Sequence, residues 1–315
     1  MRTGSGIGST VMRDFSSVID QCQLGRAAIT QPLEAKRLFH GRGHCYPGFE
    51  DLTVDWLAGV ILVGSFGDDA EGAARLTGQL AEQLADVSGA VVQLRRGRAT
   101  RGEIIAGTVP EELQVEEAGL RYLVRPMRNQ NVGLFLDMAP TRQWIRQRAQ
   151  GKRVLNLFAY TCAFSVAAVA GGASCVVNND MSRPALDWGK ENHALNDQDP
   201  RSVRMVPHNV FKSWWKLRQY GPYDLVVIDP PTNQRGSFVA EKHYAGVLKR
   251  LNELCAPGAD VLACLNSPFL NADFVPQLMT RWAPGCRFVD FLPVSADFPD
   301  QFPDRGLKIS HYRSQ

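Results

Sequence analysis

Four apolar segments of the chain are each followed at once by residues that can bind a ligand or take part in chemistry. The segments are residues 154–157, 175–178, 203–206 and 225–228, and they lead into Phe158-Ala-Tyr160, Asn179-Asp-Met181, His208-Asn-Val210 and Asp229-Pro-Pro231. Continuous apolar runs that alternate with helical segments predict parallel strands covered on both faces. Because parallel sheets bind ligands at the carboxyl ends of their strands, we expect these four points to form one site.

Two of these strand ends carry an acidic residue. Asp180 closes the second strand, where a carboxylate can accept hydrogen bonds from both hydroxyls of a nucleoside ribose. Asp229 precedes two prolines, which end the strand, remove two backbone donors and leave a stiff loop able to receive a flat group. Simpler explanations stay open, namely a helix-capping acid at Asp180 and an ordinary strand terminator at Asp229-Pro-Pro231.

The elements that would position these residues follow from the hydrophobic spacing. Helices are expected at residues 140–150, 164–170 and 183–196, the last with Ser182 as its cap and Pro184 in its first turn, and a further strand at residues 261–265. Repeated strand–helix units of this kind predict an α/β domain, which we place at residues 127–315.

The N-terminal part has a mixed pattern that predicts a smaller α/β domain over residues 51–126. Its expected elements are strands at residues 52–57, 60–63, 91–94 and 103–106, an amphipathic helix at 73–87, and a hairpin of 113–117 with 120–124. Residues 1–50 are expected to be an N-terminal extension with helical character at 14–22 and 33–39. The Gly4-Ser-Gly-Ile-Gly8 segment imitates a dinucleotide-binding motif, but no strand precedes it, which favours a flexible terminus.

Composition narrows the class of protein. The chain has 315 residues, of which 44% are hydrophobic and 21% charged, as in soluble globular proteins. We find no apolar run near 18 residues and no secretion signal, so a cytoplasmic protein without a membrane span is expected. Seven irregularly spaced cysteines favour reduced thiols over disulfides or a metal site. The net charge of +3 permits an acidic partner without requiring one.

Together these motifs resemble the class I S-adenosylmethionine-dependent methyltransferases. The likeness is strongest to the bacterial 23S ribosomal RNA methyltransferases, which include a cytosine carbon-5 family and a guanine-N7 module. It extends from about Gly43 to the C-terminus and rests on four segments: Gly133-Leu-Phe-Leu-Asp-Met-Ala-Pro-Thr-Arg142, Leu155-Asn-Leu-Phe-Ala-Tyr-Thr161, Asn179-Asp-Met-Ser-Arg-Pro-Ala-Leu186 and Asp229-Pro-Pro231. The resemblance implies a doubly wound, seven-stranded Rossmann-like sheet, with residues 307–312 as an antiparallel strand inserted near its edge.

The resemblance also implies S-adenosyl-L-methionine as the cofactor and a role for each matching residue. Phe158, Ala159 and Tyr160 would line its methionine side, Asp180 would bind the ribose, and Met181 would flank the adenine. Asn209 and Val210 would lie at the adenine edge, Asp229 and Pro230 beside the transferred methyl group, and Arg142 with Asp137 would close the pocket.

Three positions depart from the family pattern. Cys162 stands where glycine is frequent, Asn209 where an acidic residue is usual, and Asn266 where the carbon-5 enzymes have a nucleophilic cysteine. Carbon-5 of a pyrimidine needs a thiolate adduct before it can accept a methyl group, whereas a nitrogen needs alignment and at most a proton acceptor. Cys264 is the remaining candidate nucleophile, with a buried structural cysteine as the favoured alternative. A nitrogen acceptor is therefore favoured, with Asp229 and Asn266 as the catalytic residues.

The expected function is methyl transfer to a nucleobase of RNA, with ribosomal RNA as the partner and both monomer and homodimer open. A methyltransferase of a small molecule or protein, and a non-catalytic RNA-binding module with a degenerate methyltransferase fold, stay as alternatives. A dehydrogenase is disfavoured because no glycine-rich motif follows a strand. Arg95, Arg96, Arg98 and Arg101 form a basic cluster that is either a solvated loop or an RNA contact. Residues 232–238 are expected to form a mobile loop.

Overall fold

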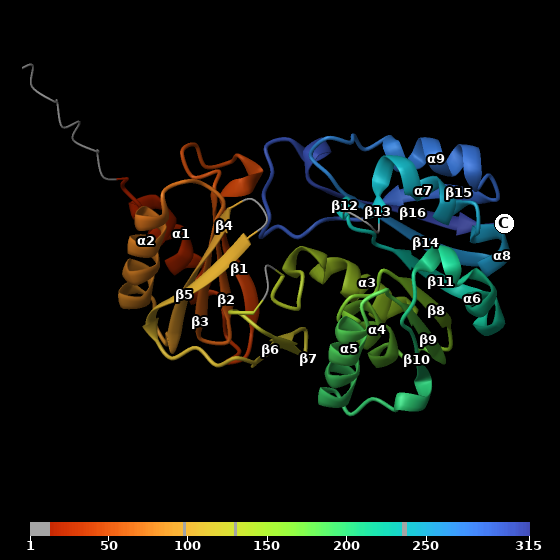
Figure 1. Ribbon diagram of the computed structural model, residues 1–315, viewed down its shortest axis with the longest axis horizontal. Coiled ribbons are helices and arrows are strands. Elements are labelled where there is room, and N and C mark those ends of the chain that lie inside the picture. The colour runs from red at the N-terminus through yellow and green to blue at the C-terminus, as the bar shows by residue number, and fades with distance from the viewer. Residues whose placement is uncertain (1–12, 97–98, 129–130, 235–237) are drawn as a thin grey trace, which may run out of the picture.

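The computed structural model describes residues 13–96, 99–128, 131–234 and 238–315 (Figure 1). The segment Gly4–Gly8, together with Arg98, Arg235 and Gly236, lies outside these ranges. Two sheets lie side by side, the smaller built from the N-terminal part and the larger from the C-terminal part (Figure 1). No helix in the described ranges is long and apolar enough to cross a membrane.

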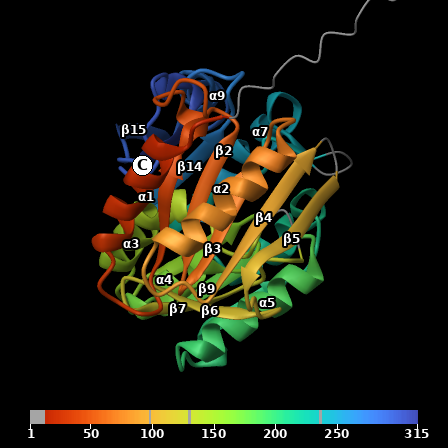
Figure 2. The same cartoon turned by 90° about the vertical axis from the view of Figure 1, so that its left-hand side faces the viewer.

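The smaller sheet has five strands in the order β1-β2-β3-β4-β5. Its strands are β1 (Ala35–His40), β2 (Leu52–Leu57), β3 (Val60–Ser65), β4 (Gly89–Arg96) and β5 (Ala99–Gly107). Neighbours are antiparallel except β3 and β4, which are parallel and joined through helix α2 (Ala70–Gln83). Helices α1 (Ser16–Ala27) and α2 cover one face of this sheet (Figure 2) and share a buried core with it.

The helical expectation for residues 33–39 was wrong. This segment contains strand β1, which pairs antiparallel with β2 and places Arg37 opposite Asp55, with their side chains in an ion pair. Pairing with a neighbouring strand has overridden the local pattern, as tertiary context commonly does for strands. Because α1 packs on this sheet and β1 belongs to it, the expected boundary at residue 50 separates two paired strands. We therefore propose that the smaller domain begins at α1.

A hairpin of β6 (Leu113–Glu117) and β7 (Leu120–Val124) connects the two parts, with the bounds that the sequence predicts. Its turn residues Ala118 and Gly119 both have positive φ, as a two-residue hairpin turn requires. The buried Val115 and Tyr122 pack with Leu62 of the smaller sheet and Val166 of the larger domain. The hairpin is thus part of a continuous apolar contact between the two sheets.

The larger sheet has seven strands in the order β10-β9-β8-β11-β14-β16-β15. They are β8 (Arg153–Leu157), β9 (Cys175–Asn179), β10 (Val203–Val206), β11 (Tyr223–Ile228), β14 (Cys255–Asn266), β15 (Cys286–Phe291) and β16 (Leu307–Ser314). Strand β16 lies antiparallel between β14 and β15, so the predicted insertion near the sheet edge is confirmed. A short pair, β12 (Asn233–Gln234) with β13 (Phe238–Val239), stands apart from this sheet.

Helices pack on both faces of the larger sheet, which confirms the doubly wound architecture. One buried cluster joins the sheet to α6 (Trp214–Tyr220), α7 (Ala240–Leu248), α8 (Leu251–Leu254) and α9 (Phe274–Trp282). Another joins it to α3 (Ala139–Arg148) and α4 (Ala163–Ala170), and α5 (Arg183–Leu195) contacts α4 and β7. The carboxyl ends of five parallel strands therefore open on one edge, where the four predicted strand-end motifs meet.

A loop after β15 makes a second contact with the smaller domain. The backbone N–H of Gln301 donates to the carbonyl of Gly43 at 2.7 Å, and the Arg37 guanidinium lies 4.5 Å from the centre of the Phe298 ring. A Cβ at Gly43 would stand 1.8 Å from the carbonyl oxygen of Pro299, so only glycine permits this approach.

Candidate active site

A cavity of about 680 Å³ lies at the carboxyl ends of the central strands of the larger sheet. All residues that the sequence predicts for the site line it: Arg142, Phe158, Ala159, Tyr160, Asp180, Met181, Asn209, Val210, Asp229, Pro230 and Asn266. The structure thus brings together side chains that are up to 124 positions apart, and their roles stay predictions. Asp137 lines the same cavity.

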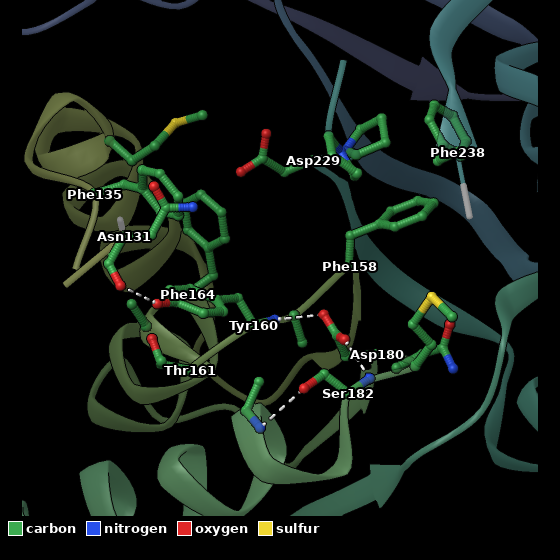
Figure 3. Close-up of a pocket in the computed structure, with 18 of the residues that line it drawn as sticks. Asn131, Phe135, Phe158, Tyr160, Thr161, Phe164, Asp180, Ser182, Asp229 and Phe238 are labelled. Atoms are coloured by element: carbon green, nitrogen blue, oxygen red, sulfur yellow. Dashed lines mark hydrogen bonds between the residues drawn. The ribbon is translucent and has the colours of Figure 1, made fainter. Parts of the chain in front are cut away.

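The loop after β8 has an unusual backbone. Phe158, Tyr160 and Cys162 have φ values of 60°, 46° and 61°, a left-handed conformation that costs energy for residues other than glycine. Hydrogen bonds hold the loop in place: Ala159 N–H donates to Asn179 O at 3.0 Å, Thr161 Oγ1 to Gly133 O at 2.6 Å, and Tyr160 Oη to Asn131 O at 2.9 Å (Figure 3). These hydrogen bonds therefore hold the loop in its left-handed conformation.

Cys162 keeps its left-handed turn because the helix beside it leaves room for the thiol. Gly189 on α5 faces it, and a Cβ at Gly189 would lie 2.4 Å from Cys162 Sγ. The thiol thus occupies the space that a side chain at position 189 would fill, and the loop keeps the left-handed turn at Cys162.

Asp180 binds backbone donors with both carboxylate oxygens. Oδ2 accepts a hydrogen bond from Tyr160 N–H at 2.9 Å and Oδ1 accepts one from Ser182 N–H at 2.8 Å (Figure 3). Each oxygen retains acceptor capacity for a further donor. Burial raises the pKa of Asp180, against the smaller opposing effect of these two hydrogen bonds. The cap of α5 is Ser182, whose Oγ accepts from Ala185 N–H, so the helix has its own capping residue without Asp180.

Asp229 and Asp137 form a pair of carboxyl groups in the cavity. Burial and the nearby charge of Asp137 raise the pKa of Asp229 to about 7, while the Arg142 guanidinium opposes the shift. Burial also raises the pKa of Asp137. Across the described ranges, no hydrogen-bond donor reaches the Asp229 carboxylate. Asp229 is therefore a carboxyl group that can bind or release a proton near neutral pH.

Arg142 contributes to the wall through bonds within the protein. Its Nε and Nη2 donate to the two carboxylate oxygens of Glu117 at 2.7 Å each, and Nη2 also donates to Phe135 O at 2.8 Å. The side chain is only 4% exposed. Arg142 therefore joins α3 and the segment around Phe135 to the β6–β7 hairpin. That it closes the pocket around a cofactor stays a prediction.

Asn209 and Met181 lie at the ends of β10 and β9. The Asn209 side-chain oxygen accepts from Phe211 N–H at 2.9 Å and caps the short helical turn Val210–Lys212, so this residue also positions Val210. Met181 is 51% exposed and offers an apolar surface at the edge of the cavity.

The sequence analysis assigned no role to several residues that line the cavity, and four of them are phenylalanines. Those that shape its wall include Asn131, Phe135, Phe164, Phe211 and Phe238. The Phe158 ring contacts Phe238 edge-on at 5.1 Å between centroids, and Phe238 stacks with Phe211 at 6.4 Å (Figure 3). Two of them had a signal: Phe135 lies in the segment Gly133–Arg142 that carries the resemblance, and Phe211 lies just after the third strand. Phe238 lies in the loop expected to be mobile, and nothing in the local pattern marks it as a wall of the cavity.

Cys264 and Asn266 differ sharply in their surroundings. Cys264 is fully buried within β14, between β11 and β16, and burial raises the pKa of its thiol. Asn266 ends the same strand, is exposed, and lines the cavity. None of the described residues that line the cavity is a cysteine.

Comparison with known proteins gives the class of protein. Residues 36–313 match the family model of S-adenosylmethionine-dependent methyltransferases, and the chain belongs to this family. The predicted family, fold class and cofactor are thereby confirmed.

The curated relatives include ribosomal RNA large subunit methyltransferases. Ribosomal RNA large subunit methyltransferase I of Aeromonas salmonicida is 31% identical over 83% of this chain and 72% of its own length. Ribosomal RNA large subunit methyltransferase K/L of Hahella chejuensis is 31% identical over 68% of this chain, which spans only about a third (32%) of that relative.

Solved structures share the fold. A protein assigned as a SAM-dependent methyltransferase from Streptococcus mutans has a TM-score of 0.84, with 22% identity over 96% of this chain and 82% of its own. Another, assigned as a methyltransferase and crystallised with SAH, has a TM-score of 0.83 and 22% identity over 94% of this chain and 80% of its own.

Proposed function

We propose that the chain transfers a methyl group from S-adenosylmethionine to a nitrogen of an RNA nucleobase, with ribosomal RNA as the substrate. The observation that carries this proposal is the Asp229 carboxyl group, whose pKa is raised to about 7 in a cavity that no described cysteine lines. Support for RNA comes from the relatives, which are ribosomal RNA methyltransferases by name.

The residues present fit the cofactor. A cavity of about 680 Å³ is of the size that proteins use for small ligands. Asp180, with acceptor capacity left on both oxygens, would hold the ribose, while Met181 and Val210 would flank the adenine near Asn209. The loop of Phe158, Ala159 and Tyr160, with Pro230 opposite, would enclose the methionine part. Bound S-adenosylmethionine would supply an electrophilic methyl group.

Asp229 would orient the acceptor and manage its proton. An amino nitrogen that forms a bond to the methyl carbon, as the carbon–sulfur bond breaks, carries one proton in excess and must release it. The Asp229 carboxylate can accept a hydrogen bond from this N–H and then take the proton. Asn266 ends β14, the neighbour of β11, and its amide can hold the edge of the base. No covalent enzyme–RNA bond is needed.

A carbon-5 acceptor is disfavoured by the position of Cys264. Its thiol is buried inside the sheet and burial raises its pKa, which is the reverse of what an attacking thiolate requires. The exposed residue at the end of that strand is Asn266, which cannot add to a pyrimidine ring.

Two substitutions separate these chemistries. We expect Cys264→Ser to leave turnover nearly intact, and Asp229→Ala to lower it by about a hundredfold or more, the usual effect of losing a proton acceptor. Ribosomal RNA from a strain lacking the protein serves as substrate, and mass mapping of its modified bases locates the methyl group. A covalent complex with RNA containing 5-fluorocytosine, abolished by Cys264→Ser, would overturn the nitrogen assignment.

A further inference from the structure

Phe269 is the most exposed large apolar side chain in the described part of the protein, at 88%. It lies three residues after Asn266, which lines the cavity. A single exposed apolar residue is common and needs no explanation by itself. Phe269 differs from such residues because it lies close to the cavity and because its backbone is held by hydrogen bonds.

The turn that carries Phe269 is pinned to the body of the protein on both sides. Lys308 of β16 donates from Nζ to the carbonyls of Ser267 and Leu270, each at 3.0 Å, and to Asp304 O at 2.7 Å. All three ammonium donors are thus used on backbone carbonyls. Lys308 is only 8% exposed, and burial lowers its pKa. The Phe269 N–H itself donates to the buried Ser267 Oγ at 3.2 Å.

The same turn is tied to the cavity wall. Thr232, which follows Asp229-Pro-Pro231 and lines the cavity, donates from Oγ1 to the carbonyl oxygen of Asn266. The segment from Asn266 to Leu270 is therefore a fixed part of the cavity rim. The backbone that carries an aromatic ring there has little further freedom to lose when a ligand binds.

A second aromatic residue and a cation lie in the segment that Lys308 joins to the Phe269 turn. Lys308 binds Asp304 together with the Phe269 turn, and next to Asp304 the Arg305 guanidinium lies 4.8 Å from the centre of the Phe302 ring. Phe302 is 41% exposed. Aromatic rings interspersed with guanidinium groups match the stacked bases and phosphates of a nucleic acid strand better than an apolar protein surface.

We propose that Phe269 is a stacking wedge for RNA, which contacts the base beside the acceptor once the acceptor has turned out of its stack. The inference rests on the proposed function. A base in folded RNA reaches a cavity at strand ends only after it is unstacked, and enzymes that do this offset the cost with inserted or stacked side chains. The exposed ring of Phe269, carried on a turn whose backbone is held, offers such a surface near the entrance.

The test compares two forms of one substrate. Ribosomal RNA from a strain lacking the protein is used either intact and refolded or cut into short single strands, with methyl incorporation as the readout. Phe269→Ala should lower kcat/KM on intact RNA by about tenfold, the size of one lost base–aromatic stack, and change it little on the short strands. Phe269→Trp should restore activity on intact RNA.

Trp215→Ala is the matched control, because Trp215 is an exposed aromatic residue (59%) on α6, outside the segment from Asn266 to Leu270. It should leave both activities unchanged, and Phe269→Ala should leave calorimetric affinity for S-adenosylmethionine unchanged. Equal activity of Phe269→Ala and wild type on intact RNA, or an equal loss on both RNA forms, would refute the wedge alone. A wild-type protein that methylates neither RNA form would refute the proposed function and the wedge with it.

Discussion

The Asp180 carboxylate accepts hydrogen bonds from two backbone N–H groups and, in our proposal, also from two ribose hydroxyls. The bonds to Tyr160 and Ser182 order the loop after β8 and the start of α5 around the ligand. The residue thus links the shape of the cavity to the affinity for the cofactor.

We predict that Asp180→Ala weakens binding of S-adenosylmethionine more than tenfold. A hydrogen bond to a charged group contributes about 1.5–3 kcal/mol, and more than one would be lost. Titration calorimetry measures the change. Asp180→Asn, which keeps one acceptor oxygen, should lose less, and Asp187→Ala on the exposed surface of α5 should lose nothing. Unchanged affinity in a folded Asp180→Ala protein would remove Asp180 from the cofactor site.

Asp229 gives a pH dependence of the reaction. Its pKa of about 7 means that the carboxylate form is lost as pH falls below 7, so kcat/KM should rise with pH up to about 7 and then level off. Asp137 raises that pKa, so Asp137→Asn should move the rising limb to lower pH. Initial rates between pH 5 and 9 measure both effects. A limb that keeps its position in Asp137→Asn would argue against Asp229 as the titrating group.

Residue types at strand ends were predictable, whereas their partners were not. Asp180 and Asp229 follow apolar runs directly, so the general location of strand ends in a parallel sheet places them in one cavity. The Glu117 partner of Arg142 lies 25 positions away in another element, and the sequence contains no local signal for that pairing. Only the tertiary structure shows that Arg142 is bound within the protein.

At the scale of elements, the loop after β8 and helix α5 are fitted to each other. The left-handed Cys162 and the glycine at position 189 occupy one space between them. The glycine at position 189 thus leaves room for the thiol at position 162, and the loop keeps its turn.

We predict that Gly189→Ala destabilises the protein and that Cys162→Gly removes most of the effect. The new Cβ would stand 2.4 Å from Cys162 Sγ, which forces a shift costing about 1–3 kcal/mol. In the double variant the sulfur is absent, and glycine also accepts a φ of 61° without strain. Denaturant unfolding measures each variant. Gly78→Ala in α2, where the nearest atom is 3.8 Å away, is the control and should be neutral or stabilising. Additive effects in the double variant would contradict the shared space.

A chain of buried polar side chains joins β8, β9, α4 and α5. Asn156 donates to Asn178, Asn178 donates to Ser165, and Ser165 contacts His193 Nε2, each at 2.9 Å. Burial lowers the pKa of His193 to about 4, despite a hydrogen bond to Gln198 that opposes the shift. His193 is therefore neutral in the folded protein at pH values where the unfolded chain protonates it.

We predict that this histidine makes stability fall as the solution becomes more acidic. The folded pKa of about 4 lies below the ordinary value of 6.5, so the contribution is fully present above pH 6.5 and is lost as pH falls towards 4. The loss is on the order of 3 kcal/mol. Urea unfolding at several pH values measures it, and the difference between wild type and His193→Gln isolates it from the carboxyl groups. A difference that does not change between pH 7 and 4 would contradict the buried neutral histidine.

The elements that the sequence predicted and those it missed differ in how strongly the local pattern marks them. The five parallel strands of the larger sheet are largely apolar runs, and the antiparallel β16 lies where it was expected. The sequence analysis assigned no range to the edge strand β15, whose residues are mostly exposed. Strand β1 is also an edge strand. Its sequence Ala35-Lys-Arg-Leu-Phe-His40 does not alternate between polar and apolar residues, and only its pairing with β2 distinguishes it from a helical segment. Local pattern was sufficient for buried strands and insufficient for these two edge strands.

For the whole molecule, the hairpin β6–β7 is one of the contacts that join the smaller domain to the larger one. It is packed into the apolar contact between them, and Asn192 of α5 accepts from Leu123 N–H at 2.8 Å while Trp188 donates to Leu123 O at 3.2 Å. On its other strand, Glu117 binds Arg142 of α3. The hairpin is thus bound to two helices that border the cavity.

The Glu117–Arg142 pair leads to a prediction about the whole molecule. Both side chains are buried, at 13% and 4% exposure, so Glu117→Ala would leave a guanidinium without its carboxylate and should lower the free energy of unfolding by about 3–5 kcal/mol. Thermal or urea unfolding measures the loss. Lys190→Ala, which breaks the exposed pair with Asp187, should change stability by less than about 1 kcal/mol.

A second variant distinguishes an unpaired charge from lost packing. In Glu117→Leu/Arg142→Met no charge remains buried, so most of the stability should return, because apolar side chains of similar size can replace a buried ion pair. If packing of Glu117 were the only contribution, adding Arg142→Met would lower stability further. A Glu117→Ala protein as stable as Lys190→Ala would show that the pair does not hold the hairpin against α3. The contact between the two sheets would then depend on the apolar core around Val115 and Tyr122 and on the loop after β15 that reaches Gly43.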